Sequence, residues 1–345
     1  MLRYFKVSII FALVCLALAA WYGWSQGGSL VAAGRLVWIV FVLAILEVSL
    51  SFDNAVVNAK ILKDMDELWR KRFLTWGMVF AVYGMYVAFP LAIVAIAAHI
   101  GPFEAVRLSL ADPVRYEQLV SSAHTGIAGF GGAFLTMVGL GFFFDEEKDL
   151  HWIDLVEKKL ARFAALPAIE IVTVLLGVVV ISSQLEPEEA LTFLTAAVLG
   201  IATFILVDGV GNLLQAREEQ AKMAGAAIKA GLGGFIYLNV LDASFSFDGV
   251  IGAFALSNNM VVIALGLSIG AMFVRTMTIM LVREGTLSQY RFLEHGAFWA
   301  ILALGGIMLV SVLYEIPDAV TGLVGAVLIG LALWRSISHN RKHPD

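Results

Sequence analysis

Two copies of one short acidic pattern occur in segments that are otherwise apolar. The first copy is LEVSLSFDNAVVNA at residues 46–59, and the second is LDASFSFDGVIGAF at residues 241–254. In each copy an acid is followed, four to six positions later, by Ser-Phe-Asp. Carboxylate, amide and hydroxyl oxygens are the ligands that hard cations such as Mn²⁺, Mg²⁺ and Ca²⁺ prefer. The two copies therefore indicate cation binding.

The candidate ligands are side-chain oxygens, most of them within the two copies. The primary candidates are Glu47, Asp53, Asn54, Asp242 and Asp248, and the secondary candidates are Ser51, Asn58, Ser246 and Asp208. No cysteine and no pair of histidines lies near the copies, which disfavours a zinc or copper site. A monovalent ion or protons are alternatives to a divalent cation. A plainer alternative is hydrogen bonding between helices, which Ser and Asn often provide in membranes.

Spacing decides which oxygens of the first copy can meet. At 100° per residue, Glu47 and Asp53 lie about 120° apart around an unbroken helix and cannot converge on one ion. A single helix face instead carries Glu47, Ser51, Asn54 and Asn58. Either the helix opens near residues 49–51, which we favour, or the two acids serve different neighbours. Asp208 is expected near the cytoplasmic end of its helix, where a capping role is the ordinary explanation.

Composition indicates a helical membrane protein. Of the 345 residues, 60% are hydrophobic and only 15% are charged, and the mean hydropathy is +0.87. Several charge-free windows reach the roughly 20 residues that cross a hydrocarbon core. The expected fold is all-α and polytopic, with about ten transmembrane helices. The predicted spans are 4–24, 34–62, 73–100, 123–145, 166–185, 190–213, 231–257, 259–282, 295–315 and 317–336.

The two copies fall in the second and seventh predicted spans, five helices apart. This spacing predicts two inverted repeats of five helices each, at residues 1–185 and 186–345, with an inner interfacial helix at 146–165. If the N-terminus is cytoplasmic, 19 of the 23 Lys and Arg residues lie in cytoplasmic segments and 3 lie outside. This asymmetry predicts an inner (plasma) membrane protein with both termini in the cytoplasm. Inverted repeats are common in secondary transporters, whose substrate sites lie between the repeats.

The buried acids need a positive partner. An acid at bilayer depth costs about 3 kcal/mol, and Arg275 is the one Lys or Arg away from the ends of a predicted span. It can balance at most one of the four acids. We therefore expect a bound cation, protonation of the acids, or both.

Four segments together resemble the TerC family of integral membrane proteins, in the branch of unknown function. They are LEVSLSFDNAVVNA, FFFDEEKDLHW, LDASFSFDGVIGAFAL and GTLSQYRFLEHGAFWAI. The resemblance implies export of a divalent metal, chiefly manganese, and an older association with tellurium-compound resistance. By motif match it places Glu47, Asp53 and Asn54 in the first acidic motif of the family, and Asp242 and Asp248 in the second. This sequence departs from the pattern in having Gly249 where the first copy has Asn54.

The expected function is export of a divalent cation across the membrane, with Mn²⁺ favoured and Ca²⁺ or Mg²⁺ as alternatives. Proton exchange is the expected coupling, because carboxylates carry either guest. The partners are then the lipid bilayer, the metal ion and protons. We expect no enzymatic activity, prosthetic group or nucleic acid. The rivals are an exporter of small organic solutes, a tellurium-resistance component, a non-transporting partner that delivers metal to exported proteins, and an intramembrane aspartyl enzyme.

Overall fold

The computed structural model describes residues 2–77, 79–144, 150–163, 166, 168–223, 231–254, 256–257, 259–314 and 316–342. These residues form helices and no strands, which confirms the all-α prediction. The helices are α1 (Leu2–Gly27), α2 (Leu30–Leu50), α3 (Phe52–Asp64), α4 (Glu67–Arg72), η1 (Phe73–Gly77), η2 (Phe80–Ala88), α5 (Phe89–Ala97), α6 (Pro102–Ala111), α7 (Pro113–Ser122), α8 (His124–Phe143), α9 (Asp154–Phe163), α10 (Ile169–Ser182), α11 (Pro187–Met223), α12 (Leu232–Phe254), α13 (Met260–Arg283), α14 (Thr286–Gln289), α15 (Leu293–Val310) and α16 (Asp318–Lys342).

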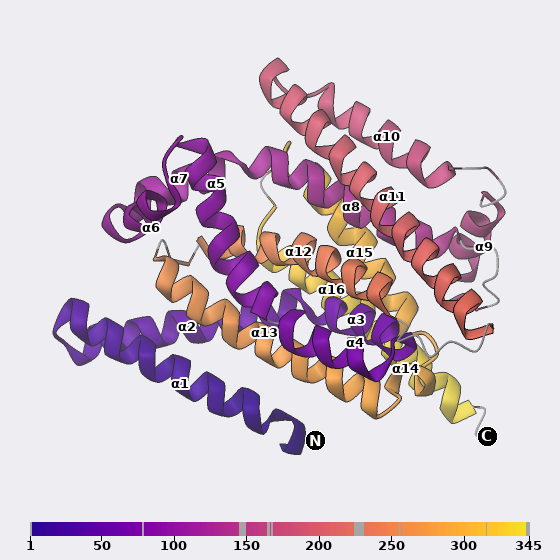
Figure 1. The fold of residues 1–345 in the computed structure, drawn as a ribbon, viewed down its shortest axis with the longest axis horizontal. Coiled ribbons are helices and arrows are strands. Elements are labelled where there is room, and N and C mark those ends of the chain that lie inside the picture. Colours follow the sequence, from indigo (N-terminus) through magenta and orange to yellow (C-terminus); the bar gives the residue numbers. More distant parts are fainter. Residues whose placement is uncertain are drawn as a thin grey trace.

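Within the described residues, seven helices are long and apolar enough to cross a bilayer, so the chain is a multi-pass membrane protein. These candidate spans are Arg3–Gly27, Leu30–Leu50, His124–Phe143, Pro187–Leu214, Met260–Arg283, Leu293–Val310 and Leu323–Arg341. The apolar helices Tyr83–Ile96 and Ile169–Ser182 are shorter. They correspond to the third and fifth predicted spans, and α12 corresponds to the seventh. In Figure 1, α12, α13 and α3 lie between the α1–α2 pair and the α10–α11 pair.

The second predicted span breaks where the serines predicted an opening. Helix α2 ends at Leu50, Ser51 adopts φ −102° and ψ 16°, and α3 begins at Phe52. The Ser51 N–H still bonds to the Glu47 carbonyl at 2.9 Å, so the break is a one-residue kink. The equivalent stretch of α12 is an uninterrupted helix. The kink therefore distinguishes the first copy from the second.

The third predicted span contains π-helical turns, η1 and η2, before α5. Pro90, the second residue of α5, has no N–H, so it cannot donate to the carbonyl of Tyr86 as an α-helix requires. The Phe89 N–H bonds to the carbonyl of Gly84, five residues earlier. Wider turns of this kind are rare and occur often at functional sites. Here they set the direction in which Tyr86 points.

The predicted inner interfacial helix at 146–165 contains α9, while residues 145–149, 164 and 165 lie outside the described residues. Phe163 is exposed, as expected for a residue that meets lipid. Glu157 is instead buried and receives a hydrogen bond from the Trp299 indole at 2.9 Å. The His295 imidazole lies 2.9 Å from its other oxygen. One face of α9 is therefore fixed to α15 by a carboxylate.

Candidate functional site

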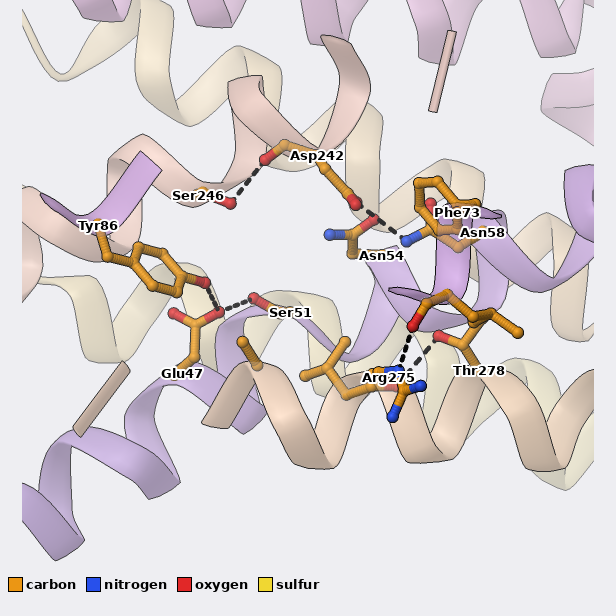
Figure 2. A pocket seen from close by; sticks show the side chains of 13 residues that line it. Glu47, Ser51, Asn54, Asn58, Phe73, Tyr86, Asp242, Ser246, Arg275 and Thr278 are labelled. Atoms are coloured by element: carbon orange, nitrogen blue, oxygen red, sulfur yellow. Dashed lines mark hydrogen bonds between the residues drawn. The ribbon is translucent and has the colours of Figure 1, made fainter. Parts of the chain in front are cut away.

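A cavity of about 50 Å³ lies among α2, α3, η1, η2, α12 and α13. It is lined by polar side chains from Glu47, Ser51, Asn54, Asn58, Tyr86, Asp242, Ser246, Arg275 and Thr278, and by Phe73, Leu74, Ala271 and Val274. A water-sized body needs about 10–15 Å³ of such space. The cavity therefore has room for an ion with a few waters. Both copies of the acidic pattern contribute to it (Figure 2).

The polar face predicted for the first copy lines this cavity as a unit. Glu47, Ser51, Asn54 and Asn58 all contribute to the lining, as their spacing predicts. All four are buried, with between 2% and 7% of each residue exposed. Residues on both sides of the kink at Ser51 therefore line the cavity.

Glu47 lies at one side of the cavity, held by two hydroxyl groups. The Ser51 hydroxyl and the Tyr86 phenol each donate to Glu47 Oε1 at 2.7 Å. Ser51 is one helical turn away, whereas Tyr86 comes from η2. Figure 2 shows both donors converging on the same carboxylate oxygen.

Asp242 lies at the other side, with the two asparagines. The Asn58 amide donates to Asp242 Oδ1 at 2.9 Å, which joins α3 to α12. The Ser246 hydroxyl donates to the Asp242 carbonyl at 2.7 Å. Figure 2 places Asn54 beside the hydrogen bond between Asp242 and Asn58. The two acids therefore share a cavity, but each has its own hydrogen-bond partners.

Three buried oxygens of the cavity lining accept no hydrogen bond from any described residue. They are Glu47 Oε2, Asn54 Oδ1 and Asn58 Oδ1. A buried acceptor without a donor carries a desolvation cost of about 1–3 kcal/mol, and more when it is charged. Three such atoms in one cavity are the arrangement that a bound cation would satisfy.

Two other predicted ligands, Asp53 and Asp208, do not line the cavity, and a third, Asp248, has a side chain outside the described residues. Asp53 is buried in the first turn of α3, where its Oδ1 accepts from the Asn54 N–H at 2.9 Å. Asp248 belongs to α12, but its side chain lies outside the described part of the chain. Asp208 is exposed and accepts from Asn212 at 2.9 Å. The capping role expected for Asp208 is wrong, because α11 continues to Met223.

Arg275 lines the cavity without pairing with an acid among the described residues. Its Nε donates to the carbonyl of Leu74 in η1 at 2.6 Å. A partly buried guanidinium thus fixes η1 to α13. The acids of the cavity consequently lack a basic partner within the described residues.

Glycines bring the neighbouring helices close to Glu47. A Cβ built at Gly270 of α13 would lie 2.4 Å from Glu47 Cβ, and one built at Gly249 of α12 would lie 2.8 Å from Glu47 Oε2. A Cβ at Gly266 would lie 2.4 Å from Leu43 Cβ. Gly266 and Gly270 form a Gly-x-x-x-Gly pattern, a recognised signal of close helix contact in membranes. The contact was therefore readable from the sequence, whereas the role of Tyr86 had no such signal.

A family model described as a protein of unknown function, DUF475, matches residues 52–343, which is most of the chain. The match begins one residue after the kink at Ser51. No curated protein and no solved structure matches this sequence.

Proposed function

The chain belongs to the DUF475 family of proteins of unknown function, and on that premise we propose that it is a membrane transporter for a divalent metal cation. The transported ion binds in the cavity between the α2–α3 segment and α12. Asp242, Asn54 and Asn58 form the main binding group, and Glu47 provides a carboxylate at the other side. We propose no enzymatic role for these residues.

The observation that carries this proposal is the set of unpartnered oxygens. Glu47 Oε2, Asn54 Oδ1 and Asn58 Oδ1 are buried and accept no hydrogen bond from the described residues. Structural polar contacts between helices would satisfy these atoms. By contrast, both oxygens of the buried Glu157 carboxylate are engaged by described partners. Glu157 thus illustrates a structural acid, whereas the oxygens of the cavity are available to an ion.

Charge favours a divalent over a monovalent ion. Glu47, Asp53 and Asp242 are buried, and Arg275 is the one basic residue that lines the cavity. The lining alone, Glu47 and Asp242 against Arg275, carries minus one when ionised. The buried Asp53, whose neighbour Asn54 lines the cavity, brings the local charge to minus two, which one divalent cation balances. Hard oxygen ligands suit Mn²⁺, Mg²⁺ or Ca²⁺.

Manganese is the ion that the resemblance to the TerC family implies, and export into the space outside an inner membrane is the direction that we propose. We propose that the helices around the cavity form an inverted repeat, which suits this plan. Helix α2 packs on α13, and α12 packs on η2, so the second span meets the eighth as the seventh meets the third. The outer helices differ, since α1 packs on α2 and α13 whereas α11 packs mainly on α8. The proposed repeat is therefore limited to the helices around the cavity.

The test is Mn²⁺ binding to the purified protein by calorimetry, followed by Mn²⁺ flux in proteoliposomes. Asp242→Asn is expected to weaken binding by at least tenfold and to reduce flux in proportion, because it removes one cavity charge. Asp208→Asn is the matched control, since Asp208 also accepts a bond from an asparagine but is exposed and outside the cavity. Equal binding by both variants would reject the site.

The same measurements separate the rival functions. If the protein exports small organic solutes, Asp242→Asn should leave Mn²⁺ binding unchanged. A partner that delivers metal to exported proteins should bind Mn²⁺ but give no Mn²⁺ flux. Asp53→Asn decides whether Asp53 is a ligand or only supports the start of α3. Flux that ignores an imposed pH gradient would reject proton exchange while leaving metal transport in place.

A further inference from the structure

Tyr86 approaches Glu47 from a helix that carries neither copy of the acidic pattern. The phenol is 2% exposed and donates to Glu47 Oε1 at 2.7 Å. Ser51 donates to the same oxygen at the same distance. A hydrogen bond to a charged carboxylate is among the stronger ones in proteins. Glu47 Oε1 is thus engaged by two donors, while Oε2 has none among the described residues.

A metal ion and a hydroxyl donor compete for the same lone pairs of a carboxylate. An ion bound at Glu47 Oε2, the oxygen without a donor, can reach bidentate binding only if Oε1 loses at least one of its two hydroxyl donors. Displacing Ser51 would disturb the residue at the kink, whereas Tyr86 comes from η2, and its phenol can turn from Glu47 towards Ser246 of α12, with which it also interacts. Figure 2 shows Tyr86 reaching Glu47 from the side opposite Ser51. The phenol is therefore the donor that can leave.

We propose that Tyr86 is a positioning residue that keeps Glu47 Oε1 from the transported cation, so that breaking and re-forming the Tyr86–Glu47 hydrogen bond accompanies tight ion binding and release. The inference rests on the proposed function and extends it to the helix that governs release. Because the phenol competes with the ion, the bond weakens binding and speeds release. If Tyr86 were a metal ligand, it would strengthen Mn²⁺ binding. If its role were purely structural, it would not change Mn²⁺ affinity.

The π-helical turns support this role. Tyr86 lies in η2, where the Phe89 N–H bonds five residues back and Pro90 contributes no N–H. Such turns are rare, interrupt the regular α-helical hydrogen-bond ladder and occur frequently at functional sites. Helix η2 also packs on α12 and α13, the helices that complete the cavity. Movement of Tyr86 can thus be transmitted to the wall that holds Asp242.

The decisive variant is Tyr86→Phe, which removes only the phenol oxygen. At pH 8.5, where protons compete less for Glu47, we expect the variant to bind Mn²⁺ about tenfold more tightly, the effect of one hydrogen bond to a charged group. In proteoliposomes kcat and KM for Mn²⁺ are both expected to fall, because release slows. Tyr83→Phe is the matched control, since Tyr83 lies in η2 but is 65% exposed.

A double-mutant cycle shows whether Tyr86 acts through Glu47. Tyr86→Phe is expected to change Mn²⁺ affinity in the wild-type background and to have no effect in a Glu47→Gln background. Ser51→Ala removes the second donor from the same oxygen and should shift affinity in the same direction. If Tyr86→Phe binds Mn²⁺ as the wild type does, or more weakly, the inference is overturned while metal transport stands. A wild-type protein that binds no divalent cation would overturn both.

Discussion

Gly270 of α13 lies directly against the side chain of Glu47 on α2. A Cβ at position 270 would be 2.4 Å from both Cβ and Cγ of Glu47, and 3.0 Å from the carbonyl of Ala44. No real Cβ tolerates such contacts, so the glycine permits the crossing of α2 and α13 at this point. The stem of the acid is consequently fixed by packing, and its carboxylate is fixed by Ser51 and Tyr86.

Gly270→Ala is expected to destabilise the protein and to displace Glu47. The methyl group has no space, and overpacking of this kind costs about 1–3 kcal/mol. Mn²⁺ binding should weaken as well, because α2 must move away from α13. Thermal unfolding in detergent and calorimetry measure the two effects. Gly34→Ala on α2 is the control, since nothing lies within 4 Å of its Cβ position. A stable Gly270→Ala protein with normal binding would contradict the role of this contact.

Gly249→Asn makes the second copy of the pattern match the first and is nevertheless expected to impair the site. The Cβ alone would lie 2.8 Å from Glu47 Oε2, so an asparagine pushes the carboxylate aside instead of adding a ligand. We expect Mn²⁺ affinity to fall by about tenfold, corresponding to about 1.4 kcal/mol. The same substitution at Gly209 of α11, where nothing lies within 4 Å, serves as the control. Tighter binding would indicate that the asparagine acts as a ligand.

The sequence predicted the helical class and the polar face of the α2–α3 segment, because helical periodicity is a local property. Glu47, Ser51, Asn54 and Asn58 line one cavity, as their spacing implied. The position of Asp53 follows from the same spacing, since it lies off that face. Tyr86 was not predictable, because an aromatic residue in an apolar span is usual and its direction depends on the π-helical turns.

The partners of the two acids also could not be predicted. Spacing along one helix gives no register between helices, so it could not show that Asp242 lies beside Asn58. The partner of Arg275 could not be predicted for the same reason, and its guanidinium bonds to the Leu74 carbonyl. The burial of Glu157 within the predicted interfacial helix could not be predicted either, because its partners His295 and Trp299 come from α15, more than 130 residues later.

Docking of α9 is expected to depend on acid pH through Glu157. Burial alone would raise the pKa of this carboxyl, but hydrogen bonds from His295 and Trp299 lower it to about 2. The folded pKa is below the unfolded value of about 4.3, so the carboxylate stabilises docking above that value. Its contribution, on the order of 2–3 kcal/mol, is lost as pH falls from about 4.3 to 2.

Hydrogen exchange of the amides of residues 154–163 measures this docking. We expect protection in the wild type at pH 7 and its loss in Glu157→Gln, which cannot accept all the bonds that the carboxylate accepts. Asp154→Asn on the same helix is the control, because its pair with Lys158 is exposed. Unchanged protection in Glu157→Gln would show that apolar contacts alone hold α9.

Asn58→Asp gives the most direct test of cation binding, because it should make stability depend on metal. The wild-type amide donates to Asp242 Oδ1 at 2.9 Å, so an aspartate at 58 replaces a hydrogen bond with two adjacent buried charges. Without metal the variant should lose about 2–4 kcal/mol of stability. An ion that binds both carboxylates at 100 times its Kd returns about 2.7 kcal/mol. Thermal unfolding with and without MnCl₂ should therefore show a larger metal-induced rise in Tm for Asn58→Asp than for the wild type. Asn212→Asp is the matched control, since Asn212 donates to Asp208 at the same 2.9 Å but in an exposed pair. Equal metal-induced shifts in the two variants would mean that the carboxylates at 58 and 242 do not hold the ion.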